Sequence, residues 1–95
     1  MNSKNMSMKM IIAIVRDADI DVILKALLEK EFRVTRIASS GGFFRRGNAT
    51  LMIGVEAEKV DEGIQIIREH CAQTLDLAVK HATVFVLDID HFEQV

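Results

Sequence analysis

The first apolar segment, residues 8–15, is nearly continuous and rich in β-branched side chains, as is typical of a buried strand. A helical period follows, because the next apolar residues recur at i, i+3, i+4, i+7 and i+8 and so share one face of an amphipathic helix. These residues are Ile20, Ile23, Leu24, Leu27 and Leu28. Either Asp17 or Asp19 can cap this helix. The start of the chain therefore predicts a strand and then a helix.

Two further strands are predicted after this helix. Residues 32–38 alternate between apolar and polar side chains, the pattern of a half-buried strand. Residues 50–55 form a second β-prone run that contains Gly54. Glycine weakens a strand, so Gly54 marks either a bulge or a point where something approaches the backbone closely. In the first of these strands the core side is expected to hold Phe32, Val34 and either Ile37 or Ala38, and the opposite side Arg33 and Thr35.

The second half of the chain repeats a helix and a strand. A helix is predicted over about residues 59–73, with Gly63 placed for close packing against the sheet. Residues 75–80 alternate and residues 82–87 are strongly β-prone, so they form either a hairpin or one bent strand. The tail, residues 88–95, is acidic, and Phe92 is expected to anchor it. The apolar positions of the helix are Val60, Ile64, Ile67 and Cys71.

The order strand, helix, strand, strand, helix, strand is the split βαβ, or ferredoxin-like, pattern. We predict an α+β fold in which two helices cover one face of an antiparallel sheet. Residues 8–95 are expected to form a single domain, and the polar residues 1–7 a disordered N-terminal extension. The uncovered face of the sheet must be polar or buried against a partner, and the apolar content of so small a chain favours a homo-oligomer.

Composition limits the class of ligand and the compartment. The 95 residues are 49% hydrophobic and 27% charged, which excludes disorder, and the formal net charge of -2 argues against binding a nucleic-acid polymer. Positive charge is nevertheless clustered, which suits a small anionic ligand. The one cysteine, Cys71, fits a reducing compartment, and no apolar run reaches the roughly 20 residues of a membrane span, so we expect a cytoplasmic protein. The cluster of positive charge mentioned above is formed by Arg33, Arg36, Arg45 and Arg46.

Residues 39–50 carry the most distinctive chemistry in the chain. Glycine lets backbone N–H groups approach a phosphate, and arginine supplies fixed positive charge. Phenylalanine can stack on a base, although the pattern alone favours packing of the two phenylalanines in the core or an interface over base stacking. The segment is therefore interpreted as the functional centre. Its paired residues are Gly41 and Gly42, Phe43 and Phe44, and Arg45 and Arg46, followed by a Gly47-Asn48 turn.

Six blocks of sequence, in this order and spacing, resemble the cyclic-di-AMP receptor family of PII-like signal transduction proteins. The blocks are MKMIIAIV at 8–15, FRVTRIA at 32–38, GGFFR at 41–45, GNAT at 47–50, VDE at 60–62 and ATVFV at 82–86. The resemblance covers most of the chain.

The resemblance implies a PII-like homotrimer of ferredoxin-like subunits with a cyclic dinucleotide, expected to be cyclic di-AMP, in each cleft between subunits. It implies a non-enzymatic receptor without a cofactor, which relays binding by loop rearrangement to an unknown downstream protein. By position, the resemblance implies that Arg33 and Thr35, on the strand before the loop, contact polar groups of the ligand. It also implies that Asn48 forms a hydrogen bond with the edge of a base. The full set of ligand-binding residues that the resemblance implies is Arg33, Thr35, Gly42, Phe43, Phe44, Asn48, Gly54, Phe85 and Gln94.

The chain also departs from this family. Members usually have a long loop rich in glycine and proline before the last strand, whereas only residues 72–81 intervene here. Phe44 replaces a common leucine, and Arg46 a common small residue. An alternative is therefore a PII-like trimeric interaction module that has lost or changed nucleotide binding. The absence of tyrosine excludes the tyrosine modification of classical PII proteins.

Metal binding and catalysis have little support in the sequence. Asp88, Asp90, His91 and Glu93 are clustered but lack the spacing of a calcium or zinc site, so no metal is expected. No nucleophile–histidine pair or Walker motif is present, and we do not expect an enzyme. The remaining catalytic alternative would use Arg45 or Arg46 with Asn48 on a phosphoryl or acyl phosphate substrate.

Overall fold

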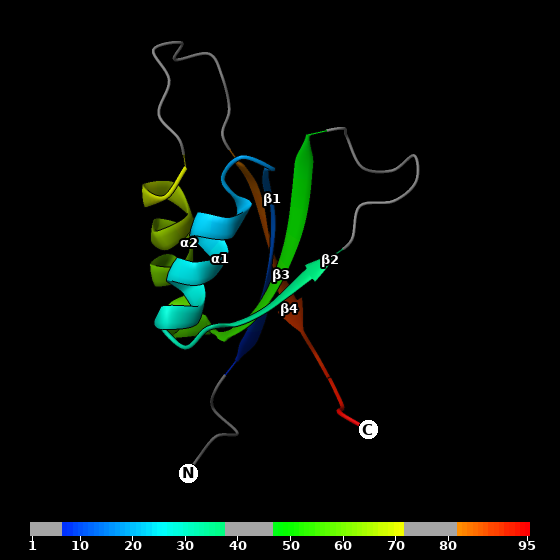
Figure 1. The fold of residues 1–95 in the computed structure, drawn as a ribbon. Coiled ribbons are helices and arrows are strands. Elements are labelled where there is room, and N and C mark those ends of the chain that lie inside the picture. The colour runs from blue at the N-terminus through cyan, green and yellow to red at the C-terminus, as the bar shows by residue number, and fades with distance from the viewer. Residues whose placement is uncertain (1–6, 38–46, 72–81) are drawn as a thin grey trace.

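The predicted ferredoxin-like order of elements is confirmed in a computed structural model, which describes residues 7–37, 47–71 and 82–95. Figure 1 shows the elements along the chain. The predicted strand over 75–80 lies outside the described residues. The elements are β1 (Met8–Arg16), α1 (Ile20–Glu29), β2 (Arg33–Ile37), β3 (Asn48–Glu56), a short 3-10 turn η2 (Ala57–Lys59), α2 (Val60–Glu69) and β4 (Ala82–Ile89).

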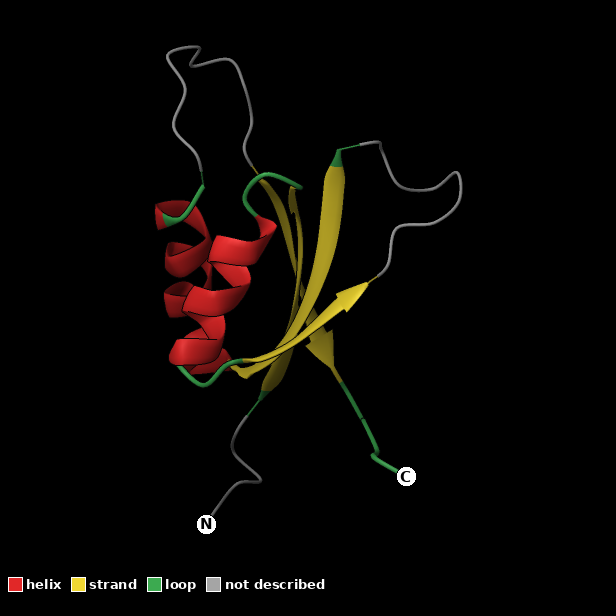
Figure 2. Ribbon diagram, viewed as in Figure 1, coloured by secondary structure: helices red, strands yellow, loops and turns green. Residues whose placement is uncertain are grey.

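The four strands form one antiparallel sheet in the order β2-β3-β1-β4. Both helices cover the same face of this sheet, so the molecule has two layers and one uncovered sheet face (Figure 2). The two central strands, β1 and β3, are paired over their whole length, from Met8 opposite Glu56 to Arg16 opposite Asn48.

The core lies between the covered face and the helices. Side chains alternate between the two faces of a strand, so the odd-numbered residues of β1 and β3 supply its sheet side. Ile20, Ile23 and Leu27 close it from α1, and Ile66 and Ile67 from α2. The sheet side is made of Ile11, Ala13, Val15, Ala49, Leu51, Ile53 and Val55, all of them buried.

Gly63 allows α2 to lie close to the sheet, as predicted. A Cβ atom at this position would lie 3.2 Å from Cδ1 of Ile11 and 3.4 Å from Cε1 of Phe32. A side chain at this position would therefore press on Ile11 and Phe32 in the core.

Three details of the helices differ from the sequence predictions. Leu28 was expected in the core, but it is 53% exposed, because it lies about 100° around the helix from Leu27 and the sheet contacts only a narrow stripe of α1. The second helix ends at Glu69, not near residue 73, and the backbone N–H of His70 caps it by donating to the carbonyls of Ile66 and Ile67. Asp19 is the N-cap residue of α1, yet its side chain makes no capping hydrogen bond.

The C-terminal tail also differs from its prediction. Phe92 was expected to anchor it, but the ring is 59% exposed. Beyond β4 the chain leaves the sheet and runs away from both layers (Figure 1). Among the described residues, no helix has the length and apolar character needed to cross a bilayer.

Candidate functional site

Five of the predicted ligand-binding residues lie on the uncovered face of the sheet. Residues directly opposite each other in an antiparallel pair project from the same face, so the register assigns each side chain to a face. One row across the sheet is Arg33, Gly54, Met10 and Leu87, and the next is Thr35, Met52, Ile12 and Phe85. Asn48 has the same parity as Gly54 along β3 and lies on the same face.

Arg33 and Gly54 form the first part of this candidate site. They are directly opposite each other at the start of β2 and the end of β3. A Cβ atom at Gly54 would meet no atom within 4 Å, so the backbone there is open to an approaching group. The guanidinium of Arg33 is exposed beside it, and both residues line the same surface pocket together with Met8 and Glu56. This corner can present a cation next to an accessible stretch of backbone.

Two arginines of the predicted basic cluster, Arg33 and Arg36, are separated by the sheet, whereas Arg45 and Arg46 lie outside the described residues. Arg36 lies opposite Leu51 on the helix-covered side, where its Nη1 is 3.7 Å from Oδ1 of Asp21 in α1. Arg33 projects from the other face. Of these two arginines, only Arg33 is available to a ligand on the uncovered face.

Asn48 lies at the far end of the same face. It is six residues from Gly54 along β3, which corresponds to about 20 Å. The preceding Gly47 has φ +89, a conformation that favours glycine, and its carbonyl accepts a hydrogen bond from the backbone N–H of Asp17 at 2.7 Å. Asn48 is therefore held at the end of the sheet by the turn that follows β1.

Phe85 and Gln94 are not brought close to Arg33. Phe85 is half exposed on the edge strand β4, and two strands separate it from Thr35, or about 14 Å across the sheet. Gln94 lies in the exposed tail beyond β4. Gly42, Phe43 and Phe44 lie outside the described residues. Of the site residues that the structure describes, Arg33, Thr35, Gly54, Asn48 and Phe85 therefore lie on a shared face but not in one group.

Two features of this face stand out in the structure, and the sequence reasoning missed the second of them. Its middle is apolar, formed by Met10, Ile12, Ile14 and Met52, and the continuous apolar run of residues 8–15 was the signal for it, since such a run predicts a strand buried on both sides. The second feature is Thr50, which is only 4% exposed and whose hydroxyl makes no hydrogen bond among the described residues. No pattern in the sequence distinguishes this threonine from an ordinary strand residue.

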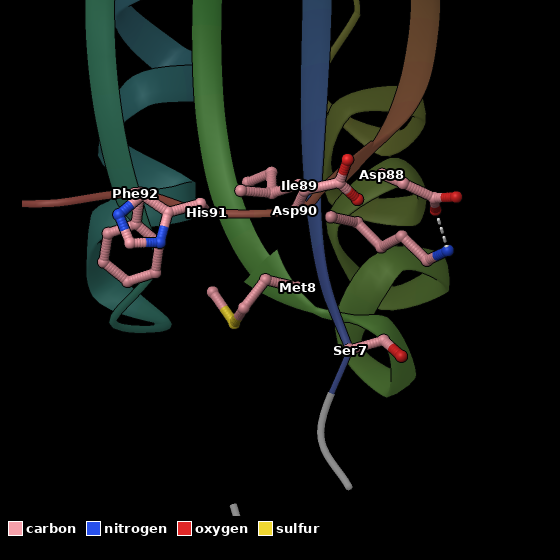
Figure 3. Close-up of a pocket in the computed structure, with 8 residues that line it drawn as sticks. Ser7, Met8, Asp88, Ile89, Asp90, His91 and Phe92 are labelled. Atoms are coloured by element: carbon pink, nitrogen blue, oxygen red, sulfur yellow. Dashed lines mark hydrogen bonds and ion pairs between the residues drawn. The ribbon is translucent and has the colours of Figure 1, made fainter. Parts of the chain in front are cut away.

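The acidic end of the chain forms a separate pocket between the first residues of β1 and the last of β4 (Figure 3). Lys9 forms a salt bridge with Asp88, and Nε2 of His91 lies 2.7 Å from Oε2 of Glu93. In the described parts of the chain, no three His, Cys, Asp or Glu side chains are grouped so that they could hold a metal ion. Lys9, Asp88 and His91 of this pocket are thus engaged in pairs.

The pKa of the Cys71 thiol is raised above its ordinary value. Burial raises the pKa of its thiol, the nearby carboxylate of Asp19 raises it further, and the charge of Arg16 opposes both. The Sγ atom also donates a hydrogen bond to the carbonyl of Ile67 at 3.2 Å. The thiol is protonated at neutral pH and acts as a packing residue at the end of α2.

Comparison with known proteins supports this fold and its ligand class. The family model described as "Cyclic-di-AMP receptor" matches residues 8–78. Among solved structures, the chain is similar to a functionally unknown protein from Pediococcus pentosaceus ATCC 25745, with 34% sequence identity and a TM-score of 0.77. That likeness covers 95% of this chain and 99% of the other, so it extends over the whole ferredoxin-like arrangement.

Proposed function

The chain belongs to the cyclic-di-AMP receptor family, and we propose that it is a non-enzymatic signal receptor that binds cyclic di-AMP between the subunits of a homotrimer. The observation that carries the proposal is the common face: Arg33, Thr35, Asn48, Gly54 and Phe85 all project from the uncovered side of the sheet. A ligand bound there would not disturb the core on the other side.

The chemistry of these residues suits a cyclic dinucleotide. The guanidinium of Arg33 can form charge-assisted hydrogen bonds to a phosphodiester, and Gly54 leaves the adjacent backbone accessible to it. The amide of Asn48 can pair with a base edge, because it offers both a donor and an acceptor. Phe85 is half exposed and can stack on a base.

The spacing of these residues favours a site completed by a second subunit. Asn48 and Gly54 are about 20 Å apart on one subunit, and Phe85 lies at the edge remote from Arg33. A neighbouring copy packed against the apolar middle of the face could bring its own Asn48 to the first subunit's Arg33. It would also cover Met10, Ile12 and Met52, which otherwise leave apolar surface in contact with water.

The proposal includes a route for the signal. Ligand binding at Asn48 would rearrange the connection between β2 and β3 and change the surface that a downstream protein contacts. The hydrogen bond from Asp17 to Gly47 supports this idea, because it joins the end of that connection to the turn before α1. A reducing, cytoplasmic compartment is part of the proposal, and the free thiol of Cys71 is compatible with it.

Isothermal titration with cyclic di-AMP tests the site. We expect Arg33→Ala and Asn48→Ala each to weaken binding by about tenfold or more, since a charged or well-placed hydrogen bond is worth roughly 1–3 kcal/mol. Arg36→Ala is the matched control, because it removes an arginine of the same strand from the opposite face. Equal affinity in the wild type and both site variants would refute the assignment. A trimer that binds no nucleotide would instead favour the interaction-module alternative.

A further inference from the structure

A second arginine lies on the uncovered face, at the end remote from Arg33. Arg16 is the last residue of β1 and is directly opposite Asn48, so the register assigns both side chains to the same face. The next residue, Asp17, donates its backbone N–H to the carbonyl of Gly47 at 2.7 Å. This hydrogen bond fixes the last residue of β1 beside the first residue of β3.

The charge of Arg16 is not used within the described parts of the subunit. The salt bridges there are formed by Lys9, Arg36, Lys59 and His91, and the side chain of Arg16 is exposed. Its charge also lowers the pKa of Cys71, against the effect of burial, so its field reaches the end of α2. Arg16 thus places positive charge at the end of β1, directly opposite Asn48.

The environment of Arg16 on this face is also polar and incomplete. Thr50 lies two residues after Asn48, on the same face, between Ile14 and Ile37. Its hydroxyl is buried without a hydrogen-bond partner among the described residues, which is unfavourable in a folded protein. This end of the face therefore combines an exposed cation, an amide and an unsatisfied hydroxyl.

We infer that Arg16 is a further ligand-binding residue, which contacts a phosphodiester group of the ligand at the Asn48 end of the uncovered face. The inference rests on the proposed function. A cyclic dinucleotide carries two phosphodiester groups. Where two subunits meet, Arg33 of one subunit and Arg16 of the other would supply one cation for each phosphodiester. Arg33 and Arg16 would then act on different phosphates of the same ligand, from neighbouring copies.

The test is isothermal titration of the full chain with cyclic di-AMP at low and at moderate salt, using Arg16→Gln, Arg16→Lys and the control Arg36→Gln. We expect Arg16→Gln to bind about tenfold more weakly and with a smaller salt dependence, because one charge-assisted contact is lost. Arg16→Lys keeps the charge and should retain most of the affinity. Arg36→Gln should stay within about twofold of the wild type, as expected for an exposed pair on the other face.

The outcomes separate this inference from the function on which it rests. If Arg33→Ala weakens binding while Arg16→Gln does not, the inference is wrong and the receptor function stands. The inference is also wrong if Arg16→Lys loses as much affinity as Arg16→Gln, because the charge would then not be the cause. If the wild type binds no cyclic di-AMP, both the role inferred for Arg16 and the proposed receptor function are wrong. A thermal melt of each variant shows whether it is folded.

Discussion

At the scale of single residues, Gly54 and Gly63 have opposite surroundings. A Cβ atom at Gly54 would enter open space on the uncovered face, whereas one at Gly63 would press on Ile11 and Phe32 in the core. Glycine is therefore needed for packing at residue 63, and packing within the subunit places no such demand on residue 54. The open space at Gly54 is compatible with the proposed approach of a ligand from outside the subunit.

The same substitution at the two glycines should separate stability from binding. We expect Gly63→Val to lower the free energy of unfolding by about 1–3 kcal/mol, as is usual for an overpacked core. Gly54→Val should leave thermal unfolding cooperative and near that of the wild type, since valine favours strands, and should weaken cyclic di-AMP binding at least tenfold. Thermal melts and titrations measure both effects. Unchanged ligand affinity in Gly54→Val would contradict the close-approach role.

Cys71 gives a pH-dependent prediction at the same scale. Because burial raises the pKa of Cys71, its thiolate should form at higher pH than the thiolate of a free cysteine. At every pH below the pKa of Cys71, alkylation by iodoacetamide should therefore be slower than for a free cysteine. Arg16 favours the thiolate, so Arg16→Gln should slow alkylation further. The rate of alkylation against pH measures this. If the pH midpoint of alkylation is at or below the midpoint for a cysteine peptide, the packing role assigned to the thiol is contradicted.

At the scale of elements, the sequence predicted which segments are strands and helices but not where each helix meets the sheet. The period of α1 correctly placed Ile20, Ile23 and Leu27 in the core, yet Leu28 fits the same period and is exposed. Whether Leu28 is buried depends on how the axis of α1 is oriented against β1 and β3. The spacing of apolar residues in the sequence does not determine that orientation. The end of α2 was misjudged because apolar spacing continued to Cys71 after the backbone had been capped by His70.

Adjacent leucines in α1 test this placement. Leu27→Ala should lower the free energy of unfolding by about 2–5 kcal/mol, because it leaves a cavity beside the sheet. Leu28→Ala should change the free energy of unfolding by no more than about 0.5 kcal/mol, as is common for surface sites. Denaturant titration measures both. Equal losses at the two positions would mean that α1 is rotated from the orientation described here, or that Leu28 is buried by another subunit.

At the scale of the whole molecule, strand alternation alone could place Arg33 and Thr35 on the face away from the core. It could not show that Asn48 lies at the opposite end of that face from Gly54, because the predicted strand began at residue 50 whereas β3 begins at Asn48. Nor could it show that Arg36 pairs with Asp21 on the other side. The composition of the site was thus accessible from sequence and resemblance, whereas its division into distant groups required the structure.

The uncovered face also leads to a prediction about assembly. Leu87 is 48% exposed in the same cross-strand row as Gly54, and Val22 is 53% exposed on the outer side of α1. We expect the wild type to be a trimer by multi-angle light scattering, Leu87→Asp to dissociate it, and Val22→Asp to leave it intact, because a charge is costly only where apolar surface is buried. Dissociation by Val22→Asp alone would place the interface on the helices instead.

The central claim is that the uncovered sheet face binds cyclic di-AMP at subunit interfaces. Its most direct test is calorimetric titration of the wild-type protein with cyclic di-AMP, with ATP and cyclic di-GMP as controls. The account predicts micromolar or tighter binding, selective for cyclic di-AMP, with one ligand per subunit. No binding of cyclic di-AMP, or equal binding of all three nucleotides, would contradict it.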